Sequence, residues 1–179
     1  MANNEAWMTA EVGGPKRASL ITKPEVAEAM IRRARRPILV IGHLAAEIEM
    51  EDKKLIDYVI DLATNTGIPV VATAHTGNAF LGRRFTPASI MSAVDIGNRL
   101  ADPTWKGIDG NGPYDLAMFA GLPYSLAWTL LSGLKNFAPH LKTMTLDNVY
   151  HPNANWSFPN ISIKDWIINL QAIIRDLGE

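Results

Sequence analysis

Seven residues of types that can bind a nucleotide fall where the predicted strands of this chain end. They are Gly42, His43, Thr73, His75, Gly77, Gly121 and Asp147. In open α/β sheets, ligands bind in the crevice outside the carboxyl ends of the strands. Glycines there let the backbone approach a phosphate, helix N-termini direct N–H groups at it, and an aspartate can accept from ribose hydroxyls. The pattern is compatible with a bound dinucleotide, whereas glycine at a strand end is more commonly ordinary turn chemistry.

Catalytic and metal-binding motifs are missing from the sequence. No G-x-G-x-x-G follows the first strand, and the second strand ends in Thr73 rather than in the acidic residue that holds an NAD ribose. There is no Walker loop and no G-x-S-x-G elbow. The histidines have no partner at H-x-x-x-H spacing, although His43 and His75 both fall in strand-end loops and could meet there. We expect neither catalytic residues nor a metal site.

Strands and helices alternate along the chain. Continuous apolar runs predict buried parallel strands at 37–42, 68–73, 115–120 and 141–146. Helical spacing predicts helices at 22–34, with a capping box from Thr22 to Glu25, at 52–66 and after Thr86-Pro87. A further helix is marked by Leu126, Leu130, Leu134 and Phe137, and the last follows a second capping box from Ser162 to Asp165. The segment 149–161 is predicted to be irregular. This order indicates an α/β fold, a Rossmann-like three-layer open parallel sheet with helices on both faces. We expect one domain at 19–179 and an N-terminal arm at 1–18.

Composition narrows the class of protein. The 179 residues carry a net charge of -1, which gives no reason to expect binding to nucleic acid or to a membrane surface. The chain has no cysteine, so it cannot form disulfides or hold a cysteine-ligated iron–sulfur cluster by itself. No long apolar run and no secretion signal stand out, so we expect a soluble cytoplasmic protein.

Four stretches of the chain are specific enough to suggest a family. They are residues 100–115, 134–137, 146–150 and 153–158, and the first contains the run D-P-x-W-x-G-x-D-G-N-G-x-Y-D. With them the chain resembles, over about residues 20–177, the epsilon subunit of the archaeal carbon monoxide dehydrogenase/acetyl-CoA decarbonylase–synthase complex.

The resemblance implies a fold and a role. The epsilon subunit is similar to the flavin-binding central domain of thiamine-diphosphate enzymes. It accompanies a large alpha subunit that carries a nickel–iron–sulfur cluster, in an alpha2-epsilon2 unit that interconverts CO and CO2 within a complex that makes or cleaves acetyl-CoA. The family implies that this chain stabilises alpha and assists electron transfer to FAD. The alternative is an FAD- or nucleotide-binding electron carrier in its own right. A free-standing nucleotide-binding enzyme is the least favoured hypothesis.

The resemblance also suggests where ligand and partner would bind. The positions that match the flavin-holding loops are Gly42, Thr73, Gly77, Gly121 and Asp147, but the loop Gly42-His43-Leu44 is poorer in glycine than a good pyrophosphate loop. Residues 102–112 show no architectural reason for their particular sequence, which makes them a candidate contact for alpha or a ligand. This contact would use Trp105, Lys106, Asp109 and Asn111.

Two further groups of side chains have a structural and a functional interpretation. Loop aromatics would be either exposed interface anchors or satellite core: Trp7, Trp105, Tyr150, Trp156 and Phe158. The arginines at 32–36 either complement the dipole of the helix that they end or form a basic docking patch.

Overall fold

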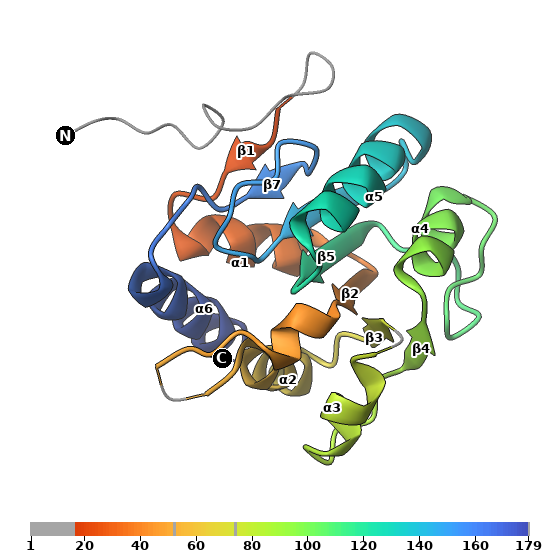
Figure 1. Cartoon of the computed structure of the whole chain (residues 1–179). Helices are drawn as coiled ribbons and strands as arrows, with labels where there is room; N and C mark the ends of the chain where they lie inside the picture. The colour runs from red at the N-terminus through yellow and green to blue at the C-terminus, as the bar shows by residue number, and fades with distance from the viewer. Residues whose placement is uncertain (1–16, 52, 74, 179) are drawn as a thin grey trace.

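The computed structural model describes residues 17–51, 53–73 and 75–178. They form a seven-stranded sheet in the order β1-β7-β6-β5-β2-β3-β4, in which every neighbouring pair is parallel. The strands are β1 (Ser19–Leu20), β2 (Pro37–Ile41), β3 (Val70–Thr73), β4 (Ser89–Met91), β5 (Leu116–Ala120), β6 (Lys142–Thr145) and β7 (Trp156–Ser157). The predicted α/β open parallel sheet is confirmed (Figure 1).

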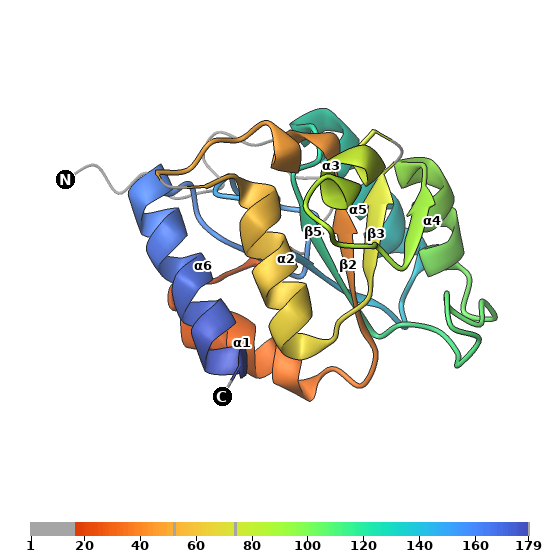
Figure 2. The same ribbon diagram turned by 90° about the horizontal axis from the view of Figure 1, so that it is seen from below.

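Helices cover both faces of the sheet. They are α1 (Pro24–Arg33), the 3-10 helix η1 (His43–Ala46), α2 (Leu55–Thr66), α3 (Gly77–Leu81), α4 (Ala93–Ala101), α5 (Tyr124–Phe137) and α6 (Ile163–Gly178). One core lies between the sheet and α1, α2 and α6, and the other lies between the sheet and α4 and α5 (Figures 1 and 2). Within the described residues, no helix combines the length and apolar character needed to cross a membrane.

The continuous apolar strands feed both cores. In β2, Leu39 and Ile41 pack into the core under α1, α2 and α6, whereas Ile38 and Val40 pack into the core under α4 and α5. Successive side chains of a strand point to opposite faces, so a strand with helices on both sides must be apolar at every position. This requirement is why continuous apolar runs in the sequence predict the central strands.

Several predicted boundaries are wrong for local reasons. The first helix has Lys23 as its N-cap and no side-chain cap, so the Thr22–Glu25 capping box does not form. Residues after Thr86-Pro87 enter the short strand β4, and α4 begins only at Ala93, where Ser92 Oγ accepts from the Asp95 N–H at 3.0 Å. The segment predicted to be irregular contains β7, which pairs with β6 and β1.

Other helix ends agree with their sequence signals. Ser162 Oγ accepts from the Asp165 N–H at 3.1 Å at the start of α6. Gly67 ends α2 with a φ of +70°. Residues 1–16 of the predicted arm lie outside the described residues, and the chain joins the sheet at Ala18, whose N–H donates to the Pro152 carbonyl at 3.1 Å.

Trp166 fixes the last helix to the sheet. Its ring is 1% exposed, and its Nε1–H donates to the carbonyl of Leu146, just beyond β6, at 2.7 Å. The Trp166→Phe change removes this donor, leaves a buried carbonyl unpaired and leaves a small void. We expect it to lower the free energy of unfolding by about 2 kcal/mol. The same change at Trp128, a half-buried residue of α5, should cost less than half as much. Equal losses in urea unfolding would contradict the role given to this bond.

Candidate functional site

The sheet reverses its strand order between β2 and β5, and the glycines predicted to approach a phosphate lie at this point. From β2 the chain continues to β3 on one side, while β5 lies on the other. Gly42 and Gly121 follow these two strands directly. The Gly42 N–H donates to the Ala120 carbonyl at 2.9 Å, and the Leu44 N–H donates to the Gly121 carbonyl at 3.0 Å. The backbone after β2 therefore runs directly against the backbone after β5.

This packing gives both glycines a structural reason that needs no ligand. A Cβ at Gly42 would lie 2.1 Å from the Gly121 carbonyl oxygen, and a Cβ at Gly121 would lie 2.5 Å from the Ala45 nitrogen. Gly121 also has a φ of +68°, which L side chains rarely adopt. The space that each glycine leaves is filled by the protein itself, by the backbone of Gly121 and Leu122 at Gly42 and by Ala45 of η1 at Gly121. A dinucleotide pyrophosphate therefore finds no open glycine cradle at the β2–β5 junction.

Asp147, directly after Leu146 at the end of the β6 segment, reaches the same junction. Its Oδ1 accepts from the Gly121 N–H at 2.8 Å, and the residue is 8% exposed. Burial raises the pKa of the Asp147 carboxyl to about 7, although the Gly121 N–H bond acts in the opposite direction. The strand-end carboxylate predicted from the sequence is present, but one of its oxygens already serves the protein backbone.

His151 is a buried neighbour of Asp147 that the sequence did not single out. Its Nε2 lies 4.0 Å from Asp147 Oδ2, its ring stacks on Tyr124 with centroids 4.6 Å apart, and its buried Nδ1 has no hydrogen-bond partner. Burial lowers the pKa of the His151 imidazole to about 4, so it is neutral near pH 7. The only hint in the sequence is its position four residues after the strand-end aspartate. Histidine and aspartate thus lie side by side beneath the surface, and the His151 backbone N–H donates to the Ser157 hydroxyl at 3.0 Å.

The other predicted site residues belong to the neighbouring β3–α3 connection. The hydroxyls of Thr73 and Thr76 lie 3.3 Å apart, and the Thr76 N–H donates to the Thr73 carbonyl at 2.7 Å. Gly77 begins α3, and a Cβ there would lie 2.7 Å from Ile90 Cδ1. His75 is exposed and His43 is half-buried, and no hydrogen bond joins them among the residues described. The structure thus brings Gly42, Gly121 and Asp147 together and leaves Thr73, His75 and Gly77 one strand away.

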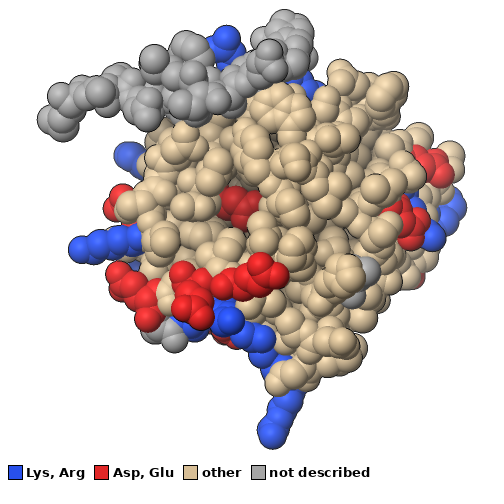
Figure 3. Space-filling view, viewed as in Figure 1, with Lys and Arg blue, Asp and Glu red and all other residues tan. Residues whose placement is uncertain are grey.

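The face that surrounds these strand ends is mostly uncharged. Figure 3 looks onto this face and places most Lys, Arg, Asp and Glu side chains at its margins. Exposed apolar side chains on the strand-end loops include Tyr124, 40% exposed, and Val149, 43% exposed. Among the described residues, no group of three or more His, Asp or Glu side chains is arranged to hold a metal ion. We call the surface around Tyr124 and Val149 the strand-end face.

The segment 102–112 lies at the other edge of the sheet, before β5 begins (Figure 2). The Asp109 carboxylate accepts from Arg36 Nη2 at 2.6 Å and from Asn111 Nδ2 at 2.9 Å, and these bonds hold its pKa well below its usual range. Arg36 also lies over the ring of Tyr114, 5.0 Å from its centroid. The expectation that this segment has no architectural reason for its sequence is wrong, because its polar groups close the loop on Arg36.

Neighbouring residues complete this closure. Asp115 accepts from the backbone N–H groups of Arg35 and Arg36 at 2.8 and 2.9 Å. Trp105 packs on Tyr114 with centroids 5.6 Å apart. Lys106 is exposed, and its carbonyl accepts from the Gly112 N–H at 2.8 Å. The loop lies at the amino ends of β2 and β5, whereas the predicted site residues lie at the carboxyl ends of the strands. It therefore does not line the same crevice.

The loop aromatics and arginines divide between the two interpretations. Tyr150 and Phe158 are 2% and 1% exposed, so the interface-anchor interpretation is wrong for these two residues, which belong to the core. Trp105 and Trp156 are half-buried, and Trp7 lies outside the described residues. Arg32 pairs with Glu28 and also donates to the Asp176 carbonyl, so with Arg36 it serves the fold rather than an open basic patch.

Comparisons with known proteins identify close relatives. A family model described as CO dehydrogenase beta subunit/acetyl-CoA synthase epsilon subunit matches residues 3–174. The acetyl-CoA decarbonylase/synthase complex subunit epsilon of Methanothermobacter thermautotrophicus is 41% identical over 95% of this chain and 94% of its own length. The corresponding subunit of Methanothrix soehngenii is 38% identical over 86% and 79%, and epsilon 1 of Methanosarcina barkeri is 35% identical over 89% of both chains.

Asp147 should make stability depend on pH. Its folded pKa of about 7 lies above the unfolded value of 3.8, so the stability that its buried neutral form contributes is complete below pH 3.8 and is lost as pH rises through 7. The Asp147→Asn variant stays neutral and can still accept from Gly121. We expect the unfolding free energy of the variant, relative to wild type, to rise by about 2 kcal/mol between pH 5 and pH 8.

Urea unfolding at both pH values measures this difference. His151 acts with the opposite sign: its stabilising contribution is present above pH 6.5 and is lost as pH falls toward its folded pKa of about 4. That contribution is present in both proteins, so it largely cancels when they are compared. A constant difference between Asp147→Asn and wild type would contradict burial of a neutral carboxyl.

Proposed function

The chain belongs to the CO dehydrogenase beta subunit/acetyl-CoA synthase epsilon subunit family, and we propose from this that it acts as a non-catalytic subunit. In this role it stabilises the CO dehydrogenase alpha subunit, the large nickel–iron–sulfur subunit, in an alpha2-epsilon2 unit. The strand-end face carries the proposal, because it combines a mostly uncharged surface with exposed Tyr124 and Val149. Apolar and aromatic side chains on an uncharged surface are what the centre of a protein interface requires.

The chemistry of the chain supports a non-catalytic role. It has no cysteine, and its strand-end residues include no nucleophile placed against a base. The Asp147–His151 pair lies beneath the surface, where it bonds to backbone and packs on Tyr124. These groups can fix the shape of the surface that a partner meets. CO oxidation itself is therefore assigned to the partner's metal centre.

Electron transfer through FAD is the alternative function. Asp147 beside the first turn of α5 favours it, since such a carboxylate suits the adenosine half of a dinucleotide. Against it, the Gly42–Gly121 contact leaves the pyrophosphate without a cradle, and Asp147 Oδ1 is already bonded. The residues at this junction fit FAD poorly, so no step of the reaction is derived through it.

The scaffolding role is tested by producing alpha with and without this chain. We expect alpha alone to lose CO dehydrogenase activity faster at elevated temperature and to recover when the chain is added. An alpha subunit that is equally stable and equally active by itself would overturn the proposal.

A pair of matched variants locates the contact. Val149→Asp places a charge in the strand-end face, and we expect it to weaken association with alpha at least about tenfold in a titration. Ile168→Asp makes the same change at an exposed site of α6, 54% exposed, and should leave association unchanged. Equal affinities for the two variants would show that another surface meets alpha.

The flavin alternative needs a separate titration. FAD added to the chain, alone and with alpha, should give no saturable shift of the flavin spectrum at micromolar concentration if the main proposal holds. A saturable shift that Asp147→Asn weakens would favour the flavoprotein instead. Substitution of Gly121 is unsuitable for this test, because a side chain there collides with Ala45 whether or not a ligand binds.

A further inference from the structure

Two chemically labile dipeptides follow one another in the segment 102–112. Asp109-Gly110 and Asn111-Gly112 are the only places in the chain where glycine follows an aspartate or an asparagine. Glycine has no Cβ, so its nitrogen is the least hindered one that the side chain of a preceding residue can meet. Such pairs close to a five-membered succinimide, and asparagine is for this reason a thermolabile residue. Asp109 and Asn111 are both exposed, so the water that the reaction requires reaches them.

Deamidation of Asn111 needs a particular conformation of the chain. The Gly112 nitrogen gives up its proton to water and attacks Asn111 Cγ, so that a bond forms between these two atoms. The bond from Cγ to Nδ2 breaks, and Nδ2 leaves as ammonia with a proton taken from water. A second water then opens the ring at either carbonyl, which gives aspartate or isoaspartate with no oxidation or reduction. The side chain must therefore turn forward onto the next residue, and the Gly112 nitrogen must release its proton.

In the structure the side chain of Asn111 is bonded backward instead. Its Nδ2 donates to Asp109 Oδ2 at 2.9 Å, and its backbone N–H donates to Asp109 Oδ1 at 3.2 Å. Arg36 holds the same carboxylate through two further bonds, from Nη1 at 3.2 Å and from Nη2 at 2.6 Å. Hydrogen bonds to an ionised group are stronger than those between neutral groups, and a bidentate arginine also fixes the geometry of the carboxylate. The group that holds Asn111 is therefore itself held in place.

The nitrogen that would attack is engaged as well. The Gly112 N–H donates to the Lys106 carbonyl at 2.8 Å, so its proton lies in a hydrogen bond. The carbonyl of Gly112 packs on Gly107, where a Cβ would lie 2.7 Å from the carbonyl oxygen. Gly107 also has a φ of +75°, which suits glycine alone. Gly112 is thus held at its nitrogen and at its oxygen, and ring closure must break the first of these contacts.

The neighbouring pair Asp109-Gly110 is protected by charge. Ring closure at an aspartate proceeds from the neutral carboxyl, because the carboxylate is a poor acceptor for a nucleophile. Hydrogen bonds from Arg36 and then from Asn111 hold the pKa of the Asp109 carboxyl well below its usual range. The same bonds that hold Asn111 therefore keep Asp109 ionised and unreactive.

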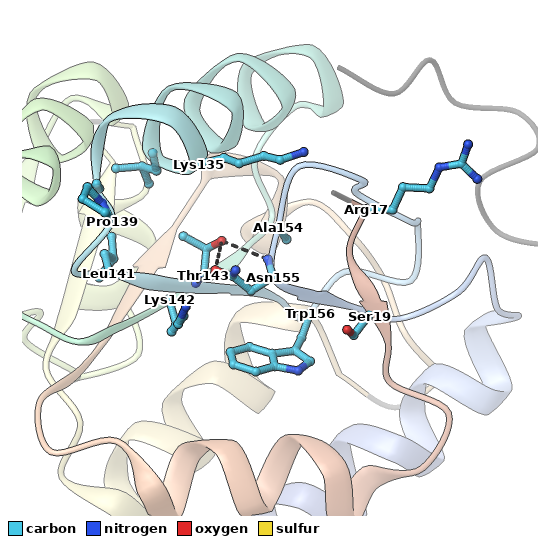
Figure 4. A pocket seen from close by; sticks show the side chains of 12 residues that line it. Arg17, Ser19, Lys135, Pro139, Leu141, Lys142, Thr143, Ala154, Asn155 and Trp156 are labelled. Carbon is cyan, nitrogen blue, oxygen red and sulfur yellow. Dashed lines mark hydrogen bonds between the residues drawn. The ribbon is translucent and has the colours of Figure 1, made fainter. Parts of the chain in front are cut away.

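Asn155 offers an internal comparison from another part of the fold. Its Oδ1 accepts from the Thr143 N–H at 2.7 Å and from Thr143 Oγ1 at 3.3 Å (Figure 4). The residue that follows Asn155 is Trp156, whose large side chain hinders attack by its nitrogen. Sequence alone therefore protects Asn155, whereas Asn111 depends on the folded loop.

From these contacts we propose that Asn111 is the deamidation site of this chain, and that the bonds from Arg36 through Asp109 to Asn111 suppress the reaction in the folded protein. Deamidation places a second carboxylate beside Asp109, where like charges repel. An isoaspartate product also adds a carbon to the backbone of the loop. Both changes weaken the closure of the loop on Arg36. The proposal is independent of how the chain meets alpha, because it concerns the amino edge of the sheet.

Incubation of the full chain at mildly alkaline pH, native or unfolded in guanidinium chloride, tests the proposal. Trypsin releases residues 107–135, which contain Asn111 as their sole asparagine and no glutamine, so the mass of this peptide reports on Asn111 alone. We expect deamidation in the native chain to be at least about tenfold slower than in the unfolded chain, because ring closure must first break hydrogen bonds, some of them to a charged group. Equal rates, or faster deamidation of Asn155 than of Asn111 in the unfolded chain, would overturn the proposal.

Variants then test whether Arg36 is the source of the protection. Arg36→Gln removes the bidentate hold on Asp109, and we expect it to accelerate deamidation of the native chain at least about threefold. Arg33→Gln removes a charge from an exposed site in the last turn of α1 and should leave the rate unchanged. Thermal unfolding checks that each variant is folded, and Asp109→Ala removes the acceptor of Asn111 directly if Arg36→Gln is not folded. A wild-type rate in a folded Arg36→Gln or Asp109→Ala protein would overturn the proposal.

A destabilised variant separates the local contact from the stability of the whole fold. Trp166 belongs to the core under α1, α2 and α6, whereas Tyr114 and Trp105 belong to the other core. Trp166→Phe therefore lowers stability without changing the loop, and the native rate of deamidation should stay close to that of wild type. Equal acceleration in Trp166→Phe and Arg36→Gln would assign the protection to global stability and overturn the role given to Arg36.

Discussion

The contact between two backbones, at Gly42 and Gly121, sets the geometry of the whole carboxyl edge of the sheet. A carbonyl oxygen occupies the place where a Cβ of Gly42 would be, and the turn of η1 occupies the place of a Cβ at Gly121. This contact draws the loop after β2 over the end of β5. It also leaves the Gly121 N–H pointing toward β6, where Asp147 accepts it. Three neighbouring strands are therefore tied together at their ends by backbone groups and one carboxyl.

Burial of Asp147 follows from that arrangement and accounts for the polar cluster around it. A carboxyl that reaches the Gly121 N–H is buried there, and burial disfavours its charged form. A neutral His151 is a tolerable neighbour there, and Tyr124 covers it with its ring. Asp147 thus bonds to the backbone and His151 packs on Tyr124, and the face around them carries most of its charged side chains at its margins (Figure 3). A surface of this kind is better suited to another protein than to the phosphates of a dinucleotide.

The sequence predicts an element correctly where its residue types are required by the local backbone conformation or by a periodic pattern of burial. The strands at 37–41 and 116–120 were predictable because burial on both faces requires an apolar residue at each position, and Gly67 was predictable as a left-handed helix end. Prediction failed at β4 and β7, which are three and two residues long and owe their conformation to a neighbouring strand. The candidate site shows the same limit. Asp147 could be found from its place after a strand, whereas His151 could not, because its role comes from a fold that brings it against Asp147 and Tyr124.

The segment 102–112 shows why a specific sequence need not mark a binding site. The sequence suggests Trp105, Lys106, Asp109 and Asn111 as contacts, because a turn does not normally need such particular side chains. The structure gives the reason for these side chains. Arg36 lies beyond the end of α1, where Asp109 accepts its hydrogen bond and Tyr114 packs against its guanidinium group. Gly107, at a φ of +75°, lets the chain pass close enough to Arg36 for this to happen. The most recognisable stretch of the chain thus anchors the start of β2 to the start of β5. Strands β2 and β5 are thus held together at their amino ends by this segment and at their carboxyl ends by the contact between Gly42 and Gly121.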